Sequence, residues 1–248
     1  MKLLDLTFPS PAENLACDEA LLDWCETGAG EEVLRFWESP QYFIVVGYAN
    51  KVTSEVKVAV SAAKAIPVYR RCSGGGTVMQ GPGCLNYTVV LKIAQDPALR
   101  SITSANHFIM ERNRAAIESL SCPKSRTSDP RSKITVRGHT DLCLGDLKFS
   151  GNSQRRRKLF LLFHGTFLLN FDLALMHEVL RMPSKQPDYR HNRDHDEFLT
   201  NLNVPARNVK TALRKVWYAD SPLDHPPMAS AVALARDKYA MPAWNQKF

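Results

Sequence analysis

The sequence lacks the features of a secreted protein, a membrane-spanning protein or a protein stabilised by a structural metal ion. No apolar run is long enough to span a bilayer, and the first residues lack the apolar core of a signal peptide. The six cysteines are scattered without a CxxC pair, so their spacing indicates neither a disulfide framework nor a zinc site. Repeats and low-complexity tracts are absent as well. We therefore expect a cytoplasmic protein with reduced thiols and no membrane association.

Composition and charge set wide bounds on function. Of the 248 residues, 44% are hydrophobic and 23% are charged, which is typical of a folded chain with a sizeable core. Lysine and arginine number 32 against 25 acidic residues, for a formal charge of +7. That excess favours an anionic partner, whether nucleic acid, an acidic protein or a small molecule. A basic solvated surface explains it equally well.

Apolar periodicity and turn signals predict a mixed α/β (α+β) fold. Helices are expected over 11–27, 54–65, 103–120, 172–180, 206–217 and 227–239, with Ser54 and Asp172 as N-caps. Strands are expected over 33–39, 42–48, 66–72, 77–80 and 85–92, and as short strands with glycine turns, including a hairpin at 144–148, through 134–171. The proline-bearing polar stretches 122–133 and 183–198 are predicted to be loops, the second of them mobile. Because tight turns join many strands, the sheets should be largely antiparallel, with helices flanking them.

Glycine is concentrated in "RRCSGGGTVMQGPGCLNY", residues 70–87. Bare backbone at Gly74, Gly75 and Gly76 lets another molecule approach closely, and the adjacent Arg70 and Arg71 offer donors for a carboxylate or phosphate. A dinucleotide fingerprint is excluded, because a helix should follow the glycines and residues 77–79 have a strand pattern instead. A Walker A loop is excluded because no GK[ST] follows. The glycine run alone would suit an ordinary loop equally well.

A second unusual stretch is "GDLKFSGNSQRRRKLFLLFHGT", residues 145–166. Lys148 alternates with Leu147 and Phe149, so it should point to the other face of a strand, where it could hold a phosphate or acyl-phosphate oxygen. Taken alone, Lys148 is more simply interpreted as an exposed strand lysine. His164 alone would be a satisfied core histidine, and the run RRRK at 155–158 would be a solvated edge or a grip for acidic protein or phosphate.

Together these stretches resemble the lipoate–protein ligase A family, within the biotin/lipoate ligase superfamily. The matching pieces follow one another along most of the chain: "NLACDEALL", "VLRFWESPQYFIVVGYANK", "RRCSGGGTVMQGPGCLNY", "GHTDLCLGDLKFSGNSQRR" and "HGT". The Arg-Arg-x-Ser-Gly-Gly-Gly and Lys-x-Ser-Gly-Asn signatures are specific as a pair, and each alone is only suggestive. The resemblance implies one catalytic domain of the biotin/lipoate ligase fold over residues 1–248, with no full-size C-terminal accessory domain.

The resemblance also implies a chemistry. Such enzymes use MgATP to activate lipoate or octanoate as an acyl-adenylate, which releases pyrophosphate, and then transfer the acyl group to a lysine of a lipoyl carrier domain. ATP and Mg²⁺ would be co-substrates, and no bound prosthetic group is expected. The carrier would be the lipoyl domain of a 2-oxoacid dehydrogenase complex or the H protein of glycine cleavage. A separate accessory chain could assist.

The same resemblance assigns roles to particular residues. Lys148 would be the catalytic residue, bridging the carboxyl and α-phosphate oxygens. Asp141 would help to hold the metal–phosphate or ribose–phosphate region, with Mg²⁺ bound through the phosphates, and Thr166 and His164 would cap the adenylate. Further contacts to substrate or adenylate are expected from Arg70, Ser73, Gly74, Gly75, Gly76, Thr77, Asn86, Ser150, Gly151 and Gly165, with Trp37, Tyr48, Arg71 and Arg155 as lesser candidates.

The sequence departs from the family pattern at three places. His139 and Thr140 stand where the family usually has arginine and asparagine before the Asp-Leu pair. Gln80-Gly81 replaces the usual His-Asp after the glycine strand, and Cys84 replaces an asparagine. These departures leave the nucleotide contacts and the acyl substrate open.

Two other functions stay open. An octanoyltransferase of the same superfamily needs no ATP and can use a cysteine nucleophile, for which Cys84 and Cys143 are the thiols nearest the signatures. Such transferases place their cysteine further ahead of the lysine, around Ser132 and Lys133, where this sequence has none, so we favour the ligase. A non-catalytic lipoate- or biotin-binding relative is the other alternative. Nucleic-acid binding is not expected, because only the charge and the RRRK run favour it.

Overall fold

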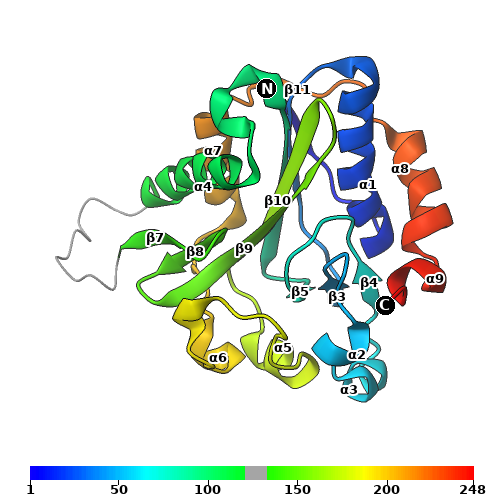
Figure 1. Cartoon of the computed structure of the whole chain (residues 1–248), viewed down its shortest axis with the longest axis vertical. Coiled ribbons are helices and arrows are strands. Elements are labelled where there is room, and N and C mark those ends of the chain that lie inside the picture. Colours follow the sequence, from blue (N-terminus) through cyan, green and yellow to red (C-terminus); the bar gives the residue numbers. More distant parts are fainter. Residues whose placement is uncertain (121–132) are drawn as a thin grey trace.

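Two sheets with helices around them make up the structure, a computed structural model that describes residues 1–120 and 133–248 (Figure 1). The larger sheet contains, in spatial order, β11 (Ser221–Pro222), β1 (Lys2–Asp5), β2 (Val33–Trp37), β6 (Cys84–Lys92), β10 (Phe160–Leu168), β9 (Leu147–Arg156), β8 (Asp141–Leu144) and β7 (Ile134–Arg137). The smaller sheet has the order β4 (Val68–Arg70), β3 (Phe43–Val46) and β5 (Val78–Gln80).

Most strand pairs are antiparallel, as predicted. β1 runs parallel to both of its neighbours and β3 runs parallel to β4, while the other paired strands are antiparallel. A two-residue turn at Gly145 and Asp146 joins β8 to β9, with Gly145 at a φ of +58°. The predicted hairpin is therefore confirmed, and glycine supplies the left-handed backbone that this turn requires.

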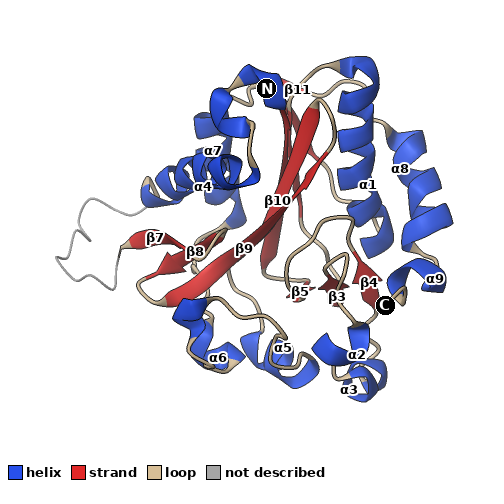
Figure 2. Ribbon diagram, in the orientation of Figure 1, coloured by secondary structure: helices blue, strands red, loops and turns tan. Residues whose placement is uncertain are grey.

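Helices cover both faces of the larger sheet (Figure 2). On one face lie α4 (Ile102–Glu118) and α7 (Ala206–Trp217), which share the largest hydrophobic core with the buried apolar residues of β6. On the other face lie α1 (Pro11–Trp24) and α8 (Met228–Leu234), packed over β10. A third cluster joins the smaller sheet to α5 (Leu173–Val179) and α6 (His195–Phe198). The smaller sheet therefore lies on the side of the larger sheet that α1 covers.

Shorter elements complete the described chain. They are η1 (Cys25–Ala29), α2 (Val52–Glu55), α3 (Val58–Ala63), η2 (Ile93–Gln95), η3 (Pro97–Leu99), η6 (Asp188–Arg190), η7 (Ala235–Tyr239) and α9 (Pro242–Asn245). Within the described ranges, no helix has the length and apolar character needed to cross a membrane.

Local capping signals explain where two helices begin. Ser10 accepts a hydrogen bond from the N–H of Glu13, and the Glu13 side chain accepts one from the N–H of Ser10, which together form a capping box at the start of α1. Asp172 caps α5, as predicted, by accepting a hydrogen bond from the N–H of Leu175. The first turn of each helix is therefore satisfied without help from the rest of the fold.

Some local predictions are wrong. Residues 54–65 form parts of two short helices, and Ser54 lies inside the first of them and does not cap it. The stretch 183–198 contains η6 and α6, and its Arg190 and His195 are buried. These two polar side chains are used inside the protein, which composition alone does not reveal. Of the predicted loop 122–133, only Lys133 falls within the described residues.

Candidate active site

A cavity of about 790 Å³ is lined by both sheets, by α1 and by the segment 180–199. Its walls include most of the site residues predicted from the sequence: Trp37, Arg71, Gly75, Gly76, Thr77, Asn86, Asp141, Lys148, Ser150, Gly151, His164, Gly165 and Thr166. The walls do not include Arg70, Ser73, Gly74, Tyr48 or Arg155. A volume of this size suits a small-molecule substrate or cofactor.

Backbone pairing in the larger sheet aligns the cavity floor. Trp37 on β2 pairs with Asn86 on β6, and Asn86 pairs with Thr166 on β10. Thr166 in turn pairs with Gly151 on β9, and Gly151 pairs with Asp141 on β8. Directly paired residues project to the same face of a sheet. Five strands therefore deliver one straight row of residues to the cavity, although the row spans residues 37 to 166.

Lys148 is held at this row by a carboxylate. Its Nζ lies 2.8 Å from Oδ1 of Asp141, and both side chains remain partly open, at 23% and 12% exposure. The Tyr189 hydroxyl donates to the other oxygen of Asp141 at 2.7 Å, and the Cys143 thiol donates to the Tyr189 hydroxyl at 3.5 Å. Burial and the neighbouring Asp141 raise the pKa of Tyr189, so its hydroxyl stays a donor. The result is a fixed ammonium group facing the cavity.

The glycine at position 151 makes room for that ammonium group. A Cβ added at Gly151 would lie 2.9 Å from Lys148 Nζ and 3.0 Å from Lys148 Cε, which is closer than van der Waals contact allows. Any larger residue would push the lysine away from Asp141. The Lys-x-Ser-Gly-Asn signature thus encodes a cation and the space that it occupies.

The glycine run next to β5 forms an open edge of the cavity. Gly75 has a φ of +86°, a conformation that L side chains rarely adopt, while a Cβ added at Gly74 or Gly76 would meet nothing within 4 Å. The buried Arg71 donates to the backbone oxygens of Gly74 and Gly76, the latter at 2.7 Å. Arg71 therefore sets the shape of the run, and the missing side chains leave space beside it.

Arg70 does not line the cavity, contrary to the role predicted for it. It is fully buried, and its Nη1 donates to the backbone oxygens of Gly47, Tyr48 and Asn50 at 2.8 to 3.0 Å. Its remaining donors reach the backbone oxygens of residues 244 and 245. The guanidinium group joins two segments of backbone, 47–50 and 244–245, and all of its hydrogen bonds to described residues go to backbone oxygens.

A buried polar chain runs from the glycine loop to α1. The Ser73 hydroxyl lies 2.6 Å from Nε2 of His164, and Nδ1 of His164 lies 3.0 Å from the Asp18 carboxylate. Because a carboxylate only accepts, the neutral ring carries its proton on Nδ1 and accepts the serine proton at Nε2. Although burial by itself raises the pKa of Asp18, the Arg35 guanidinium and His164 outweigh it and lower the pKa below its ordinary value.

This Ser73–His164–Asp18 order matches that of a nucleophilic triad, but the serine is badly placed for that chemistry. Ser73 is 1% exposed and lies off the cavity wall, and its oxygen also accepts from Nε of Arg71. This chain of hydrogen bonds is therefore suited to fixing the glycine loop against the larger sheet. Its members on the cavity wall are His164 and Asp18.

Unpartnered polar atoms mark the floor between the two sheets. Gln80 on β5 donates to the Thr166 hydroxyl at 2.9 Å, and Thr166 donates to Oδ1 of Asn86 at 2.7 Å. Oε1 of Gln80, Nδ2 of Asn86 and Nε1 of Trp37 are buried without a hydrogen-bond partner among the described residues. Such atoms are costly to leave unpaired, so this floor is suited to a ligand or water molecules with polar groups of their own.

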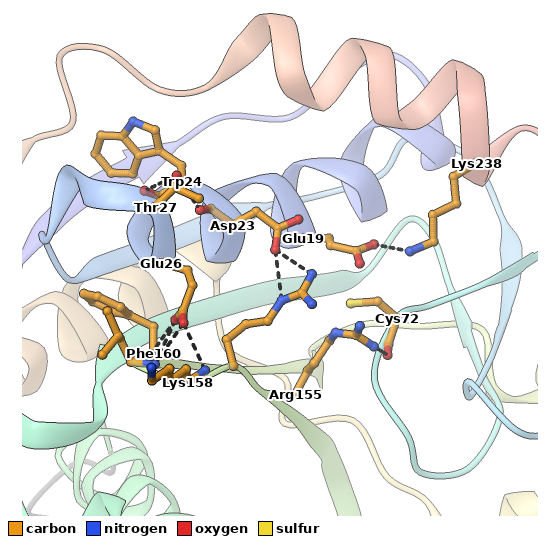
Figure 3. Close-up of polar contacts among 12 residues, drawn as sticks. Glu19, Asp23, Trp24, Glu26, Thr27, Cys72, Arg155, Lys158, Phe160 and Lys238 are labelled. Carbon is orange, nitrogen blue, oxygen red and sulfur yellow. Dashed lines mark hydrogen bonds and ion pairs between the residues drawn. The ribbon is translucent and has the colours of Figure 1, made fainter.

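Arg155 and Arg156 of the RRRK run are half-buried, while Arg157 and Lys158 are exposed. Arg155 and Arg156 donate to backbone oxygens at 2.7 Å, and in the case of Arg155 the acceptor belongs to Cys72 (Figure 3). Arg157 pairs with Asp23 at 2.7 Å. These contacts explain the run as a brace between β9, α1 and the start of the glycine loop.

A glutamate supports the same brace. Glu26, in η1, accepts hydrogen bonds from the backbone N–H groups of residues 158, 159 and 160 at about 3.0 Å (Figure 3). Those N–H groups form the turn between β9 and β10. One carboxylate therefore closes the hairpin that carries Lys148 and His164.

No cysteine in the described ranges lines the cavity. Cys143 is fully buried, and burial raises its pKa. Burial also raises the pKa of Cys17 to about 11 and of Cys72 to about 12. A thiol nucleophile needs a lowered pKa and access to substrate. The described thiols, Cys84 among them, have neither, and Ser132 lies outside the described residues.

The sequence analysis missed Asp18, Tyr189 and Arg190 as cavity residues. Tyr189 and Arg190 stand in a stretch whose prolines and charges indicate a loop, and only the isolated aromatic residue within it hinted at a buried role. Asp18 stands inside "NLACDEALL", where an acidic residue on an apolar helix face could have marked it. Both features can be seen in the sequence, but neither is specific for a residue that lines a cavity.

The cavity wall thus combines a lysine–aspartate pair with part of the glycine run. The family model of the lipoyl protein ligase A/B catalytic domain matches residues 10–213. The chain therefore belongs to this family, and its mixed α/β catalytic-domain fold is the one predicted from the sequence.

Relatives within the family carry two kinds of name. The octanoyltransferase LipM of Geobacillus kaustophilus is 27% identical across 99% of this chain and 98% of its own length. A protein of Aeropyrum pernix, provisionally named lipoate-protein ligase A, is 31% identical over 68% of this chain and 58% of its own length. Membership of this family identifies the protein as an enzyme of the lipoate ligase and octanoyltransferase type.

Solved structures agree on the fold. A lipoate-protein ligase A bound with ATP is 26% identical, with a TM-score of 0.79, and covers 99% of this chain and 98% of that one. A bi-partite lipoate protein ligase from Thermoplasma acidophilum, studied with its E2 lipoyl domain, is 22% identical, with a TM-score of 0.80 over 99% and 95%.

Proposed function

We propose that this protein is an ATP-dependent lipoate–protein ligase. It would activate lipoate or octanoate as an acyl-adenylate and transfer the acyl group to a lysine of a lipoyl carrier domain. The observation that carries the proposal is the composition of the cavity wall, which offers a fixed ammonium group and bare glycine backbone and, among the described residues, no thiol. These groups are suited to stabilising phosphate charge.

The reaction requires charge to be neutralised. A carboxylate oxygen of the acid attacks the α-phosphorus of ATP, a P–O bond breaks, and pyrophosphate leaves. Both reactants are anions, so Lys148 would lie between the carboxyl and α-phosphate oxygens and offset their repulsion as the new bond forms. The carrier lysine then attacks the acyl carbon, and AMP leaves together with a proton from the amine.

Other wall residues would position the adenylate. Gly75 and Gly76 leave space beside the glycine loop, and Thr166 and His164 lie on the strand that faces it. The polar floor at Asn86 and Thr166 would take a polar part of the substrate, since an alkyl chain would leave those groups unpaired.

The magnesium role of Asp141 stays a prediction. Both of its carboxylate oxygens already accept, one from Lys148 and one from Tyr189. Magnesium prefers free carboxylate or phosphate oxygens. In this arrangement the metal that accompanies ATP would be held by the phosphates, and Asp141 would act first by orienting Lys148.

An octanoyltransferase is the second candidate, and the names of the LipM relatives favour it. It would take the acyl group from a thioester, without ATP, through a cysteine. The five described cysteines are buried away from the cavity wall, which favours the ligase. Cys122 lies outside the described residues, so the test has to include it.

The partner would be a lipoyl domain, as in the Thermoplasma acidophilum system, whose ligase is bi-partite. By the same analogy, a separate accessory chain could take part. A cytoplasmic location and the organisation of residues 1–248 as one catalytic domain remain part of the proposal.

Pyrophosphate release separates the two candidates. The protein is incubated with lipoate or octanoate, MgATP and a lipoyl domain, and pyrophosphate and acylated carrier are measured. We expect release that depends on both acid and ATP. Transfer from an octanoyl carrier protein without ATP, lost in Cys122→Ala but kept in the matched Cys84→Ala variant, would overturn the ligase assignment.

A further inference from the structure

One buried arginine of the cavity wall has no anionic partner. Arg190, on η6, is 5% exposed and lines the cavity. Its Nε donates to the backbone oxygen of Arg193 at 2.9 Å, and its guanidinium carbon lies 4.6 Å from the ring centre of Phe198. Its Nη2 has no hydrogen-bond partner among the described residues, and no ion pair there involves it. The guanidinium group of Arg190 therefore has N–H donors that no described residue accepts from.

The other buried arginines near the cavity differ from it. Arg35 pairs with Asp18, and Arg70 and Arg71 donate to several backbone oxygens each. A buried charge normally needs such partners, because leaving water is expensive. Burial lowers the pKa of Arg190, which reflects the same cost. An unpaired buried donor in a native protein indicates a ligand or water molecule that completes it.

Arg190 lines the same cavity as the groups that the proposed reaction uses. The preceding residue, Tyr189, donates to Asp141, which holds Lys148, so the arginine and the lysine belong to one connected part of the wall. Two exposed cations, Arg181 and Lys185, line the same cavity.

Other ionisable groups reduce that positive charge only in part. Glu55 and Asp188 also line the cavity, and the Glu55 carboxylate already accepts from Ser184. Burial, helped by Arg190, lowers the pKa of the adjacent His195 to about 4, so that ring is neutral at neutral pH. Arg190 is thus the permanently charged, buried donor of this end of the cavity.

We propose that Arg190 forms a phosphate subsite of the cavity that holds the β- and γ-phosphates of ATP, which leave as pyrophosphate. This inference rests on the proposed ligase function for the identity of the nucleotide. Lys148 would meet the oxygens at the bond that forms, and Arg190 would hold the group that leaves. A planar guanidinium fork matches phosphate oxygens better than an ammonium group does. A phosphopantetheine-bearing thioester would present the same chemistry, a phosphate group.

Calorimetry with inorganic pyrophosphate tests the subsite without any turnover. We expect Arg190→Met to weaken binding by about 10- to 100-fold, and Arg190→Lys, which keeps the charge but loses the fork, by less. Methionine retains the packing on Phe198, and the melting temperature of each variant checks that it folds. The matched control is Arg207→Gln, which removes one exposed charge outside the cavity wall and should bind pyrophosphate normally. Equal affinity in wild type and in both Arg190 variants would overturn the subsite.

4′-Phosphopantetheine distinguishes the two phosphate sources. If pyrophosphate binds through Arg190 and 4′-phosphopantetheine does not, the subsite and its assignment to ATP both stand. If 4′-phosphopantetheine binds through Arg190 and pyrophosphate does not, the pyrophosphate assignment is overturned. If ATP-dependent pyrophosphate release is intact and unchanged in Arg190→Met, the ligase stands and the subsite falls.

Discussion

The basic residues on the two sides of the cavity differ in how their donors are used. Beside the glycine loop, Arg70 and Arg71 donate almost entirely to backbone oxygens, and Arg70 does not reach the cavity wall. On the opposite side, Lys148 has one carboxylate partner and remains open, and Arg190 keeps an unused donor. A signature rich in arginine can therefore be structural, while the single lysine is the cation that the proposed reaction uses.

Removing the lysine gives the largest expected effect. Lys148→Ala should lower the rate of adenylate formation by about 1,000-fold, because a fixed charge at the reacting oxygens is lost. The rate is measured by pyrophosphate release. Its melting temperature should stay within a few degrees of wild type, since the lysine is partly exposed. A variant with normal activity would contradict the role given to Lys148.

Removing the buried arginine should change stability first. Arg70→Met leaves backbone oxygens from two segments, 47–50 and 244–245, without a donor, so we expect a loss of about 3 kcal/mol in the free energy of unfolding. Urea denaturation followed by fluorescence measures it. If stability were unchanged and only substrate affinity fell, Arg70 would be a binding residue after all, and the contrast between the two sides would disappear.

A methyl group at position 151 should move the lysine without removing it. Gly151→Ala places a Cβ within 2.9 Å of Lys148 Nζ, so the ammonium group must shift from Asp141. We expect the turnover rate to fall by about 10-fold with little change in stability. Gly74→Ala is the matched control, because its Cβ meets nothing within 4 Å and Gly74 is off the cavity wall. Equal rates in the two variants would argue against a precise position for Lys148.

The pH dependence of stability tests the role of Asp18 in the Ser73–His164–Asp18 chain of hydrogen bonds. Because the folded-state pKa of Asp18 lies below its ordinary value of 3.8, its ionised form stabilises the fold above that value. This contribution is lost as the pH falls through the lowered pKa. Asp18→Asn should therefore show a shallower loss of stability below about pH 4, by up to about 1.4 kcal/mol per pH unit. Urea midpoints at several pH values measure the slope, and parallel slopes would remove Asp18 from this role.

Local patterns in the sequence were enough to predict most of the fold. Strand alternation in 85–92 and the Asp172 cap hold in the structure, since both depend on neighbouring residues only. The helix at 54–65 fails because residues 55 to 57 take part in contacts with residues far along the chain, such as the Val56–Leu180 bridge. Local propensity does not contain those contacts.

The candidate site was predictable where a motif carries its own geometry. Lys148 and Gly151 belong to one short motif, so the sequence predicts both as site residues. Strand alternation would put residues three apart on opposite faces, and their contact occurs where the β8–β9 pairing shifts register. The partners Asp18 and Tyr189 come from segments more than 40 residues from the groups that they contact, and no spacing rule joins them. Arg70 shows the opposite error, because a motif next to a site was taken for the site itself.

The straight row from Trp37 to Asp141 also bears on how the enzyme is made. Its members are brought together by strand pairing between residues up to 80 positions apart, so no fragment that lacks β6, β9 or β10 can contain the row. Long-range pairing is the slow part of folding. During synthesis or refolding, catalytic competence would therefore arise only with the last of these pairings, and activity would report the completion of the sheet.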